Sequence, residues 1–353
     1  MSLVMKRGIW PTADQEMWRE LCQRSGPLDD GGGLAHLRET SRTTLELHYG
    51  RWIQWIADTC PEVLSIRPVE RATIERLQLW LGDLSHTRPM SQWSFVGDVV
   101  RVLQAAAPTA NWRDHKRLVK HLQRQAGQGD RSRKAGRVLD SGVLLRAGID
   151  LATRQAEAAT TPLEALKRYR DGTMVAFLSM MPIRRRALAG LIIGQSICFL
   201  PGRIQIALPE DLTKTGVPWE ATVSEKIAPL LRGYLERVRP KLMARGRQEH
   251  DVLWVGDWGA RYQLNYLGHK IGRITEKIIG VRVTPHLFRD AAATTLARRS
   301  PDAARIIPPV LGHSSNLTSQ KHYIHAGSIE AGRGLMGVIN QIKAGRSTER
   351  RIR

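Results

Sequence analysis

The spacing of apolar residues predicts that residues 38–125 form a small bundle of helices. Within this range, apolar side chains recur every three or four positions, which places them on one face of each helix. Four such helices are predicted. The first begins at Thr40 and has its apolar positions over 45–56, the second spans 69–84, and the last two follow the capping candidates Ser91 and Asn111. Helices of this kind bury their apolar faces against one another in a bundle.

The residues before the bundle predict a short helix followed by a flexible connection. Helical spacing runs from Ala13 to Arg24, and the segment after it, SGPLDDGGG, is rich in glycine and polar residues. We therefore expect residues 1–37 to form an N-terminal extension to the bundle.

Residues 139–333 predict a second domain that combines helices with a small sheet. Apolar and β-branched residues over 204–208 and 219–223 flank Gly216, a pattern typical of two antiparallel strands joined by a turn. The fold class is therefore mainly α with a small antiparallel β-sheet, and residues 334–353 are expected to form a C-terminal helix and basic tail. Helices are predicted over 141–158, 162–180, 224–239, 264–279, 287–299 and 303–311, with another after Ile183.

Composition and charge indicate a globular protein with a polyanionic partner. The 353 residues are enough for two domains, and 42% hydrophobic with 25% charged residues argues against wholesale disorder. The 54 Lys and Arg against 33 Asp and Glu give a net charge of +21, which favours nucleic acid over an anionic membrane surface. No run of about 18 apolar residues and no signal peptide occur, so we expect no membrane partner and a cytoplasmic, nucleoid-associated protein.

The most basic segment runs from residue 111 to residue 138, over the end of the predicted bundle and the junction between the two predicted domains. Residues 126–138 are rich in glycine and charge and poor in apolar side chains, so we interpret them as a basic linker. Such a run can be a solvated face, but its one-signed charge at a domain junction favours contact with a phosphate backbone. The predicted DNA-binding residues are Lys116, Arg117, Lys120, Arg124, Arg131, Arg133, Lys134 and Arg137.

Several kinds of site are unsupported by the sequence. The three cysteines are far apart and never form C-x-x-C, which excludes a disulfide framework and a cysteine zinc finger. No phosphate-binding G-x-x-x-x-G-K-[ST] loop occurs, and no cluster of residues has metal-ligand spacing. We therefore expect neither a metal nor a cofactor.

A block of His, Arg and Tyr residues near the C-terminus carries the candidate chemistry. It contains TPHLFR over 284–289, VLGH over 310–313 and KHYIH over 321–325. The block resembles the C-terminal signature of the tyrosine recombinase (phage integrase-like) family, which has H-x-x-R at a helix start, then L-G-H, then a nucleophilic tyrosine. The matching residues are His286, Arg289, His313 and Tyr323.

Two upstream segments extend this resemblance. SMMPIRRRAL, residues 179–188, is similar to the family segment around the first catalytic arginine, usually T-G-x-R-x-x-E-L. Arg184 matches that arginine, and because Arg185 and Arg186 follow it, the assignment depends on the register. The stretch TKTG, residues 213–216, lies in the predicted hairpin, as does the catalytic lysine of the family, which corresponds to Lys214.

The resemblance covers the catalytic domain predicted over 139–333. The bundle predicted over 38–125 resembles the helical core-type DNA-binding domain of the family only in general character. Among the departures from the usual pattern, Ala187 stands where many members have Glu and Asp290 stands where His is common. These departures remove none of the core catalytic groups.

The residue types suit phosphodiester chemistry that needs neither metal nor ATP. A tyrosine ester retains the energy of the phosphate bond that it replaces. Arg184 and Arg289 could clamp the non-bridging oxygens with bidentate hydrogen bonds, a geometry that lysine does not offer. His286 and His313 would add donors and handle the tyrosine proton, and Lys214 would protonate the leaving 5′-hydroxyl.

The resemblance implies a site-specific recombinase that cleaves and rejoins DNA through a 3′-phosphotyrosyl intermediate. Such a reaction integrates, excises or resolves a DNA element. The resemblance also implies double-stranded DNA with inverted-repeat core sites as substrate and a homo-tetramer on that DNA, and it allows for an accessory DNA-bending or directionality factor. Two alternatives remain open at this point. One is a type IB topoisomerase-like enzyme, and the other is a non-catalytic DNA-binding regulator on the same fold.

Overall fold

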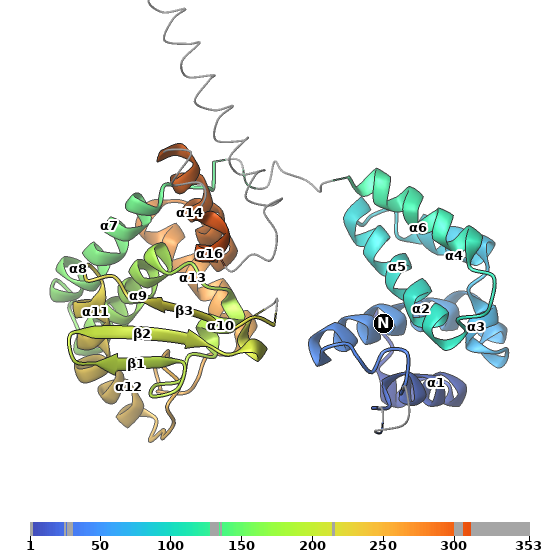
Figure 1. Cartoon of the computed structure of the whole chain (residues 1–353), viewed down its shortest axis with the longest axis horizontal. Helices are drawn as coiled ribbons and strands as arrows, with labels where there is room; N and C mark the ends of the chain where they lie inside the picture. The colour runs from blue at the N-terminus through green and yellow to red at the C-terminus, as the bar shows by residue number, and fades with distance from the viewer. Residues whose placement is uncertain are drawn as a thin grey trace, which may run out of the picture. The chain divides into compact units, whose positions relative to one another are not determined.

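The computed structural model describes residues 3–24, 26, 31–127, 134, 136–213, 216–299 and 306–311. The chain divides into two compact units (Figure 1), Met1–Arg131 and Ser132–Arg353. Each unit has a hydrophobic core of its own. The fold is mainly α with one small antiparallel sheet, as the sequence predicts. No helix among the described residues is long and apolar enough to cross a membrane.

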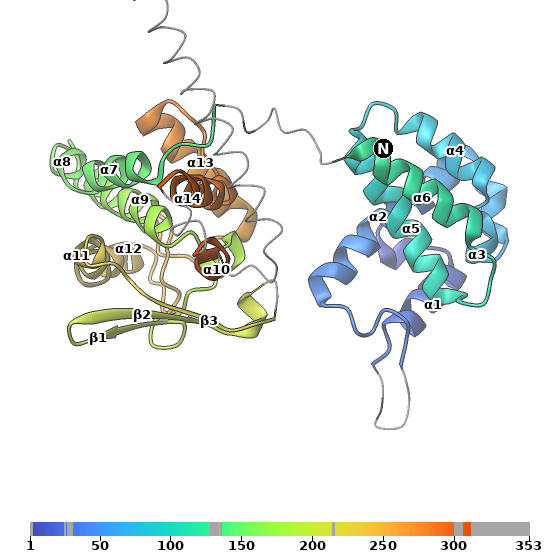
Figure 2. The same cartoon turned by 45° about the horizontal axis from the view of Figure 1, so that its top comes forward.

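The first unit is a bundle of helices (Figure 2). Tryptophans lie in its core. Trp52 and Trp80 are fully buried, with their ring centroids 5.1 Å apart, and α2 packs against α5. Its helices are α1 (Thr12–Cys22), α2 (Glu39–Thr59), α3 (Pro68–Arg71), α4 (Ile74–Asp83), α5 (Pro89–Ala106) and α6 (Arg113–Ala126).

The segment predicted as an N-terminal extension shares the core of this bundle. Trp10 of the first segment and Leu34 after α1 are buried with the bundle residues. Asp14 is fully buried and lies 2.6 Å from the Arg71 guanidinium, and its other oxygen accepts a 2.6 Å hydrogen bond from the Tyr49 hydroxyl. The carboxylate of α1 is therefore joined to α2 and α3 in the interior of the unit.

The helix boundaries of the first unit differ from the predictions at three places. The helix predicted over 69–84 is two helices, because the Thr73 hydroxyl accepts from the Arg76 amide and starts a new helix. Ser91 lies inside α5, which begins at Pro89, since proline has a helical φ and needs no hydrogen-bond acceptor at a first turn. Asn111 accepts from the Arg113 amide and so lies one residue before the N-cap Trp112.

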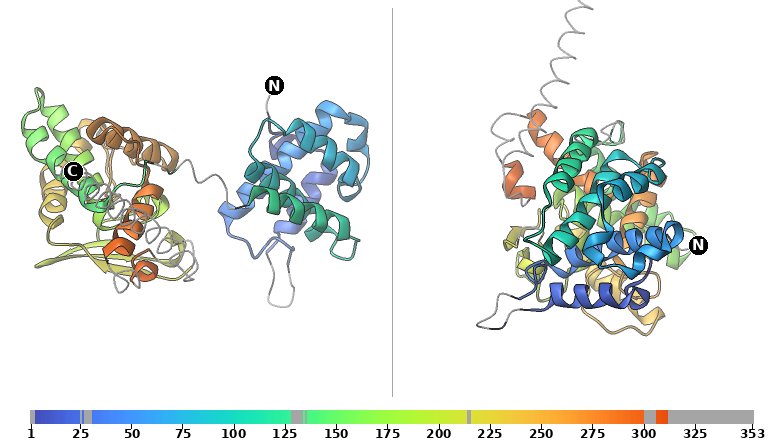
Figure 3. Two further views of the ribbon diagram at one scale, coloured as in Figure 1. Left: turned by 90° about the horizontal axis from the view of Figure 1, so that it is seen from above. Right: turned by 90° about the vertical axis from the view of Figure 1, so that its right-hand side faces the viewer.

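The second unit places helices on one side of a three-stranded antiparallel sheet (Figures 2 and 3). Strand order is β1-β2-β3, and buried β2 residues face the helices. The elements are α7 (Ser141–Ala152), α8 (Arg154–Glu157), α9 (Pro162–Met180), α10 (Arg185–Ala189), β1 (Ile197–Leu200), β2 (Arg203–Leu208), β3 (Trp219–Thr222), α11 (Ala228–Gly233), α12 (Arg239–Arg245), α13 (Leu264–Ile279), α14 (Pro285–Arg299) and α16 (Ile307–Leu311).

Helix α9 is the central element of the second unit and contacts α7, α8, α13 and α14. Its closest neighbour is α7, because two glycines bring the backbones together. A Cβ atom at Gly148 would lie 2.5 Å from the Ala176 amide nitrogen, and one at Gly172 would lie 2.4 Å from that of Ala152. Neither position accepts a larger residue without separating the two helices.

The sheet contains one strand more than the sequence analysis predicts. Strands β2 and β3 match the two predicted strands, and Ile206 pairs with Ala221 across them. The additional strand β1 pairs Ile197 with Ile206, and it turns into β2 at Gly202, which has a φ of +73°. Four residues are too few for a clear alternation of apolar and polar positions.

Two helical predictions in the second unit are also corrected. The helix predicted over 224–239 begins at Ala228 and continues, through a π-helical turn over Tyr234–Val238, into α12. The helix predicted over 141–158 is interrupted at Thr153, whose φ and ψ of −110° and −94° are not helical, so that α7 and α8 are separate. Helices α9 and α13 have the predicted bounds.

We expect Asp14→Ala to lower the free energy of unfolding of the first unit by about 3–5 kcal/mol, because it leaves the Arg71 guanidinium buried without its counter-charge. Urea unfolding followed by tryptophan fluorescence measures this loss. Glu70→Gln is the control, since Glu70 pairs with Arg67 on the exposed surface and should hardly shift the midpoint. Equal midpoints for the two variants would contradict the prediction.

Candidate active site and nucleic-acid interface

The guanidinium of Arg289 connects three segments of the second unit. It extends from the second turn of α14, where the residue is only 7% exposed. One nitrogen donates to the Pro182 carbonyl oxygen at 2.8 Å, and another donates to the Leu311 carbonyl oxygen at 2.7 Å. These bonds hold the segment before α10 and the end of α16 against α14, and they use two of the five N–H donors of the guanidinium.

Arg184 stands out among the three consecutive arginines. It is the N-cap residue of α10 and is partly buried, whereas Arg185 and Arg186 are exposed. Arg185 lies across α13, where a Cβ atom at Gly268 would come within 2.9 Å of its Cδ. Arg184 and Arg289 lie close enough for the charge of Arg184 to affect the ionisation of Arg289.

The electrostatics of this arginine pair favour a bound anion. Burial lowers the pKa of Arg289 to about 10, with a further lowering from the charge of Arg184 and an opposing effect from Asp290. Burial likewise lowers the pKa of Arg184. Because two neighbouring, partly desolvated cations disfavour each other, a phosphate between them would be bound favourably.

His286 belongs to the same cluster. It lies in the first turn of α14, three residues before Arg289, and the residue is exposed to solvent. Desolvation lowers the pKa of its imidazole; the Asp290 carboxylate opposes this, and the charges of Lys134, Arg289 and Arg184 lower the pKa further. The lowered pKa favours the neutral form of the imidazole, which can accept a proton from a hydroxyl group.

Comparison with family models identifies this arrangement. The model of the phage integrase family matches residues 150–328, which is half of the chain. The chain belongs to the phage integrase family. The matched range includes α14, the arginine pair and every residue predicted to be catalytic. The resemblance to tyrosine recombinases noted from the sequence is thus confirmed.

The fold is shared with a solved structure at low sequence identity. The XerH site-specific recombinase, in a post-cleavage complex with a palindromic difH substrate, is 15% identical with a TM-score of 0.54, over 84% of this chain and 79% of that one. The Tn1549 transposon integrase, solved with circular intermediate DNA, is 14% identical with a TM-score of 0.49, over 84% and 94%. A search of curated proteins finds no match.

Only part of the predicted phage integrase site lies within the described residues. The structure brings Arg184, His286 and Arg289 together around the start of α14. Thr213, beside the predicted lysine, is buried, and Leu311, held by Arg289, precedes the predicted L-G-H histidine by two positions. The other predicted site residues, Lys214, His313, Tyr323, Arg131 and Arg133, lie outside the described residues.

Two of the cations predicted to contact DNA have partners within the second unit. The Lys134 amine lies 2.8 Å from an oxygen of Asp290, and the Arg137 guanidinium donates to the Arg282 carbonyl oxygen at 2.7 and 3.2 Å. The sequence analysis noted Asp290 only as a departure from the family pattern. The residues around Asp290 in the sequence do not indicate that it forms an ion pair, because its partner Lys134 is far away along the chain.

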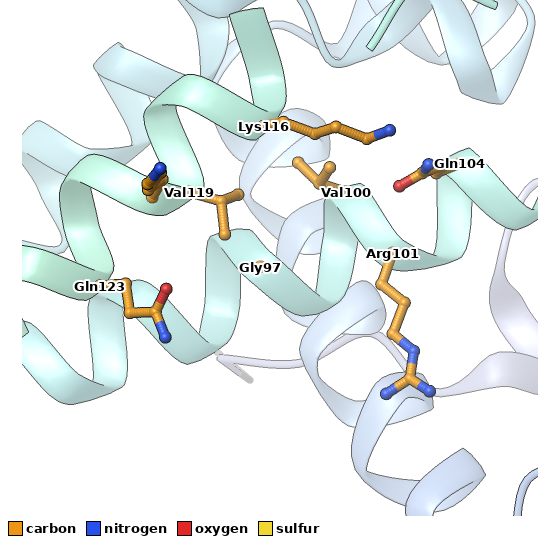
Figure 4. A pocket seen from close by; sticks show the side chains of 8 residues that line it. Gly97, Val100, Arg101, Gln104, Lys116, Val119 and Gln123 are labelled. Atoms are coloured by element: carbon orange, nitrogen blue, oxygen red, sulfur yellow. The ribbon is translucent and has the colours of Figure 1, made fainter. Parts of the chain in front are cut away.

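The basic face of α6 is a second candidate interface, within the first unit. Lys116, Arg117, Lys120 and Arg124 are exposed, while Leu122 and Ala126 face the core. Figure 4 shows the groove beside this face, which has a volume of about 330 Å³. The groove is lined by Gly97, Val100, Arg101 and Gln104 of α5 and by Lys116, Val119, Lys120 and Gln123 of α6.

The residues that α5 and the end of α6 contribute to this groove are not among those predicted from the sequence. Arg101 and Gln104 are polar positions three residues apart in an otherwise apolar part of α5, and they lie on one helix face. Their spacing was the available signal. Cations and amides lining one groove give donors for phosphates and for base edges.

We expect Lys116→Gln and Lys120→Gln each to reduce the slope of log affinity against log salt concentration by about one, because each removes one phosphate contact. The affinity for duplexes of unrelated sequence, measured by fluorescence anisotropy at several salt concentrations, gives the slope. Arg19→Gln, on the exposed surface of α1, is the control and should leave the slope unchanged. Unchanged slopes for both lysine variants would exclude α6 as a phosphate-binding face.

Proposed function

We propose that this member of the phage integrase family is a site-specific recombinase that cleaves and rejoins DNA through a 3′-phosphotyrosyl intermediate. The observation that carries the proposal is the cluster of two partly desolvated guanidiniums, Arg184 and Arg289, beside the imidazole of His286. Two neighbouring, partly desolvated cations favour the binding of an anion, and an imidazole that holds no proton can assist proton transfer at that anion. A DNA phosphate is the anion that such a family member would meet.

In the proposed reaction, the Tyr323 hydroxyl attacks the scissile phosphate. A bond forms between the tyrosine oxygen and phosphorus, the bond to the 5′-oxygen breaks, and Lys214 supplies the proton that makes the 5′-hydroxyl a leaving group. The arginine pair stabilises the charge that develops on the non-bridging oxygens. The single proton of the tyrosine hydroxyl passes to one imidazole, that of His286 or that of His313.

Rejoining reverses these steps with a different strand. A 5′-hydroxyl from a partner duplex attacks the phosphotyrosyl ester, the tyrosine leaves, and the proton returns to it through the same groups. The ester retains the energy of the original phosphodiester, so the proposed cycle needs neither ATP nor a metal ion. We propose inverted-repeat core sites as substrate and a homo-tetramer on DNA, with an accessory factor as a further possible partner.

The domain roles follow from this proposal. Residues 38–125 would form the core-type DNA-binding domain, with phosphates bound along α6, and residues 139–333 would form the catalytic domain. Residues 126–138 would be the linker, and residues 334–353 would be a C-terminal helix and basic tail. The protein would act on the DNA of the cytoplasm.

We expect the wild-type protein to form covalent adducts with DNA, and Tyr323→Phe to form none, because the variant lacks the attacking hydroxyl. Protein is incubated with sheared genomic DNA in EDTA and denatured in detergent, and the DNA that remains attached is sequenced. Tyr266→Phe, which changes an exposed tyrosine of α13, is the control and should retain the adducts.

The distribution of adducts tests the proposal against its two alternatives. Adducts concentrated at one inverted-repeat locus support the recombinase. Adducts scattered over many loci indicate a topoisomerase-like enzyme instead. A wild-type protein that binds DNA tightly but forms no adducts is a DNA-binding regulator, and the proposed function is then wrong.

The register of the first catalytic arginine is tested with three single variants. We expect Arg184→Ala to slow adduct formation by about 10²–10³-fold, because one donor to the developing charge is lost. Arg185→Ala and Arg186→Ala remove exposed cations and should slow it far less. The rate is measured with an excess of protein over a duplex that carries the captured site. A larger loss for either neighbour would shift the assignment to it.

A further inference from the structure

Lys134, from the segment predicted as the linker, reaches the candidate active site of the second unit. Its amine lies 2.8 Å from Oδ2 of Asp290, whose side chain is 7% exposed, whereas the lysine side chain is 45% exposed. Asp290 follows Arg289 directly and lies one helical turn after His286. The ion pair therefore lies beside the arginine cluster, on α14 itself.

Further contacts hold the chain after Lys134 on the same unit. The Arg137 guanidinium donates twice to the Arg282 carbonyl oxygen, just before α14. The Ser141 amide donates to the Thr295 hydroxyl at 3.0 Å, and that hydroxyl donates to Asp140 at 3.2 Å. Lys134 and the described residues after it thus make several polar contacts with α14 or with the residues just before α14.

The charge of Asp290 works against the proposed chemistry unless it is neutralised. The pKa values of Arg289 and His286 are lowered by burial, and the charge of the Asp290 carboxylate opposes this lowering in both groups. The carboxylate is therefore close to both. An unneutralised carboxylate at this place would repel a phosphate. It would also attract the guanidinium of Arg289 away from the carbonyl oxygens of Pro182 and Leu311.

We propose that Lys134 is a positioning residue for the arginine pair and acts through Asp290. By neutralising and holding this carboxylate, the lysine leaves Arg289 on its two carbonyl partners and preserves the positive charge of the pair for a DNA phosphate. The inference rests on the proposed function for its catalytic consequence. It assigns a predicted DNA-contact residue of the linker to the catalytic centre, through an acid that replaces the histidine common in the family.

The rival explanation is that Lys134 binds a DNA phosphate directly. The two explanations differ in what happens when the carboxylate is removed. If the lysine acts through Asp290, it becomes dispensable once Asp290 is neutral. If it contacts phosphate, its loss is equally harmful with or without the carboxylate.

A double-mutant cycle on the full chain separates the two. Lys134→Gln, Asp290→Asn and the double variant are compared with the wild-type protein in the rate of covalent-adduct formation at saturating protein. We expect Lys134→Gln to slow the rate about tenfold and Asp290→Asn or the double variant to remain within about threefold of the wild-type rate. Lys134→Arg should restore the rate, and Lys241→Gln on exposed α12 is the matched control. A double variant as slow as Lys134→Gln, or a fast Lys134→Gln, overturns the inference.

A second readout does not depend on catalysis. The groups whose charges act on His286 are Asp290, Lys134, Arg289 and Arg184, so its imidazole titration, followed by NMR on the DNA-free protein, reports on the ion pair. We expect Lys134→Gln to raise the pKa of His286 and Asp290→Asn to lower it further. No change in Lys134→Gln would overturn the inference. If the pKa of His286 shifts as expected but the protein forms no DNA adduct, the ion pair is supported and the proposed function is rejected.

Discussion

The candidate site depends on one buried guanidinium. Arg289 is held in the interior by two backbone carbonyl oxygens, one from the segment that leads to Arg184 and one from the end of α16. Burying a cation with neutral partners is costly, and the lowered pKa of Arg289 records that cost. The arrangement has a structural benefit, because a single side chain holds together two segments that are distant in the sequence. An anion that reaches the pair would recover part of the cost of burial.

Local sequence places that guanidinium. Pro285 begins α14 sharply, and the Thr284 carbonyl oxygen accepts from the Leu287 amide at 2.8 Å, so the first turn is fixed. Phe288 is fully buried and fixes the rotation of the helix. With that face in the core, His286 and Arg289, three residues apart, point toward the same side. The H-x-x-R spacing is thus a consequence of helical geometry as well as a family signature.

The sequence predicted what depends on long, regular patterns. Helices α9 and α13 have the predicted bounds because each shows several turns of apolar periodicity. Short elements such as β1 offer too few positions for a period, and the break before α4 depends on one hydroxyl of Thr73. The sequence could not predict either that the N-terminal extension contributes to the core of the first unit. This contribution depends on contacts such as the ion pair between Asp14 and Arg71, which are 57 residues apart.

The same limit applies to the basic run between the two units. Composition presents it as one stretch of positive charge, but the contacts divide it into two parts with different roles. On α6 the cations are exposed beside a groove, which suits a long-range attraction for phosphate. Lys134 and Arg137 instead have a carboxylate and a carbonyl oxygen as partners. A net charge cannot distinguish these roles, because the difference lies in whether folding supplies an acceptor. For Lys134 that acceptor is Asp290, which directly follows Arg289 on α14.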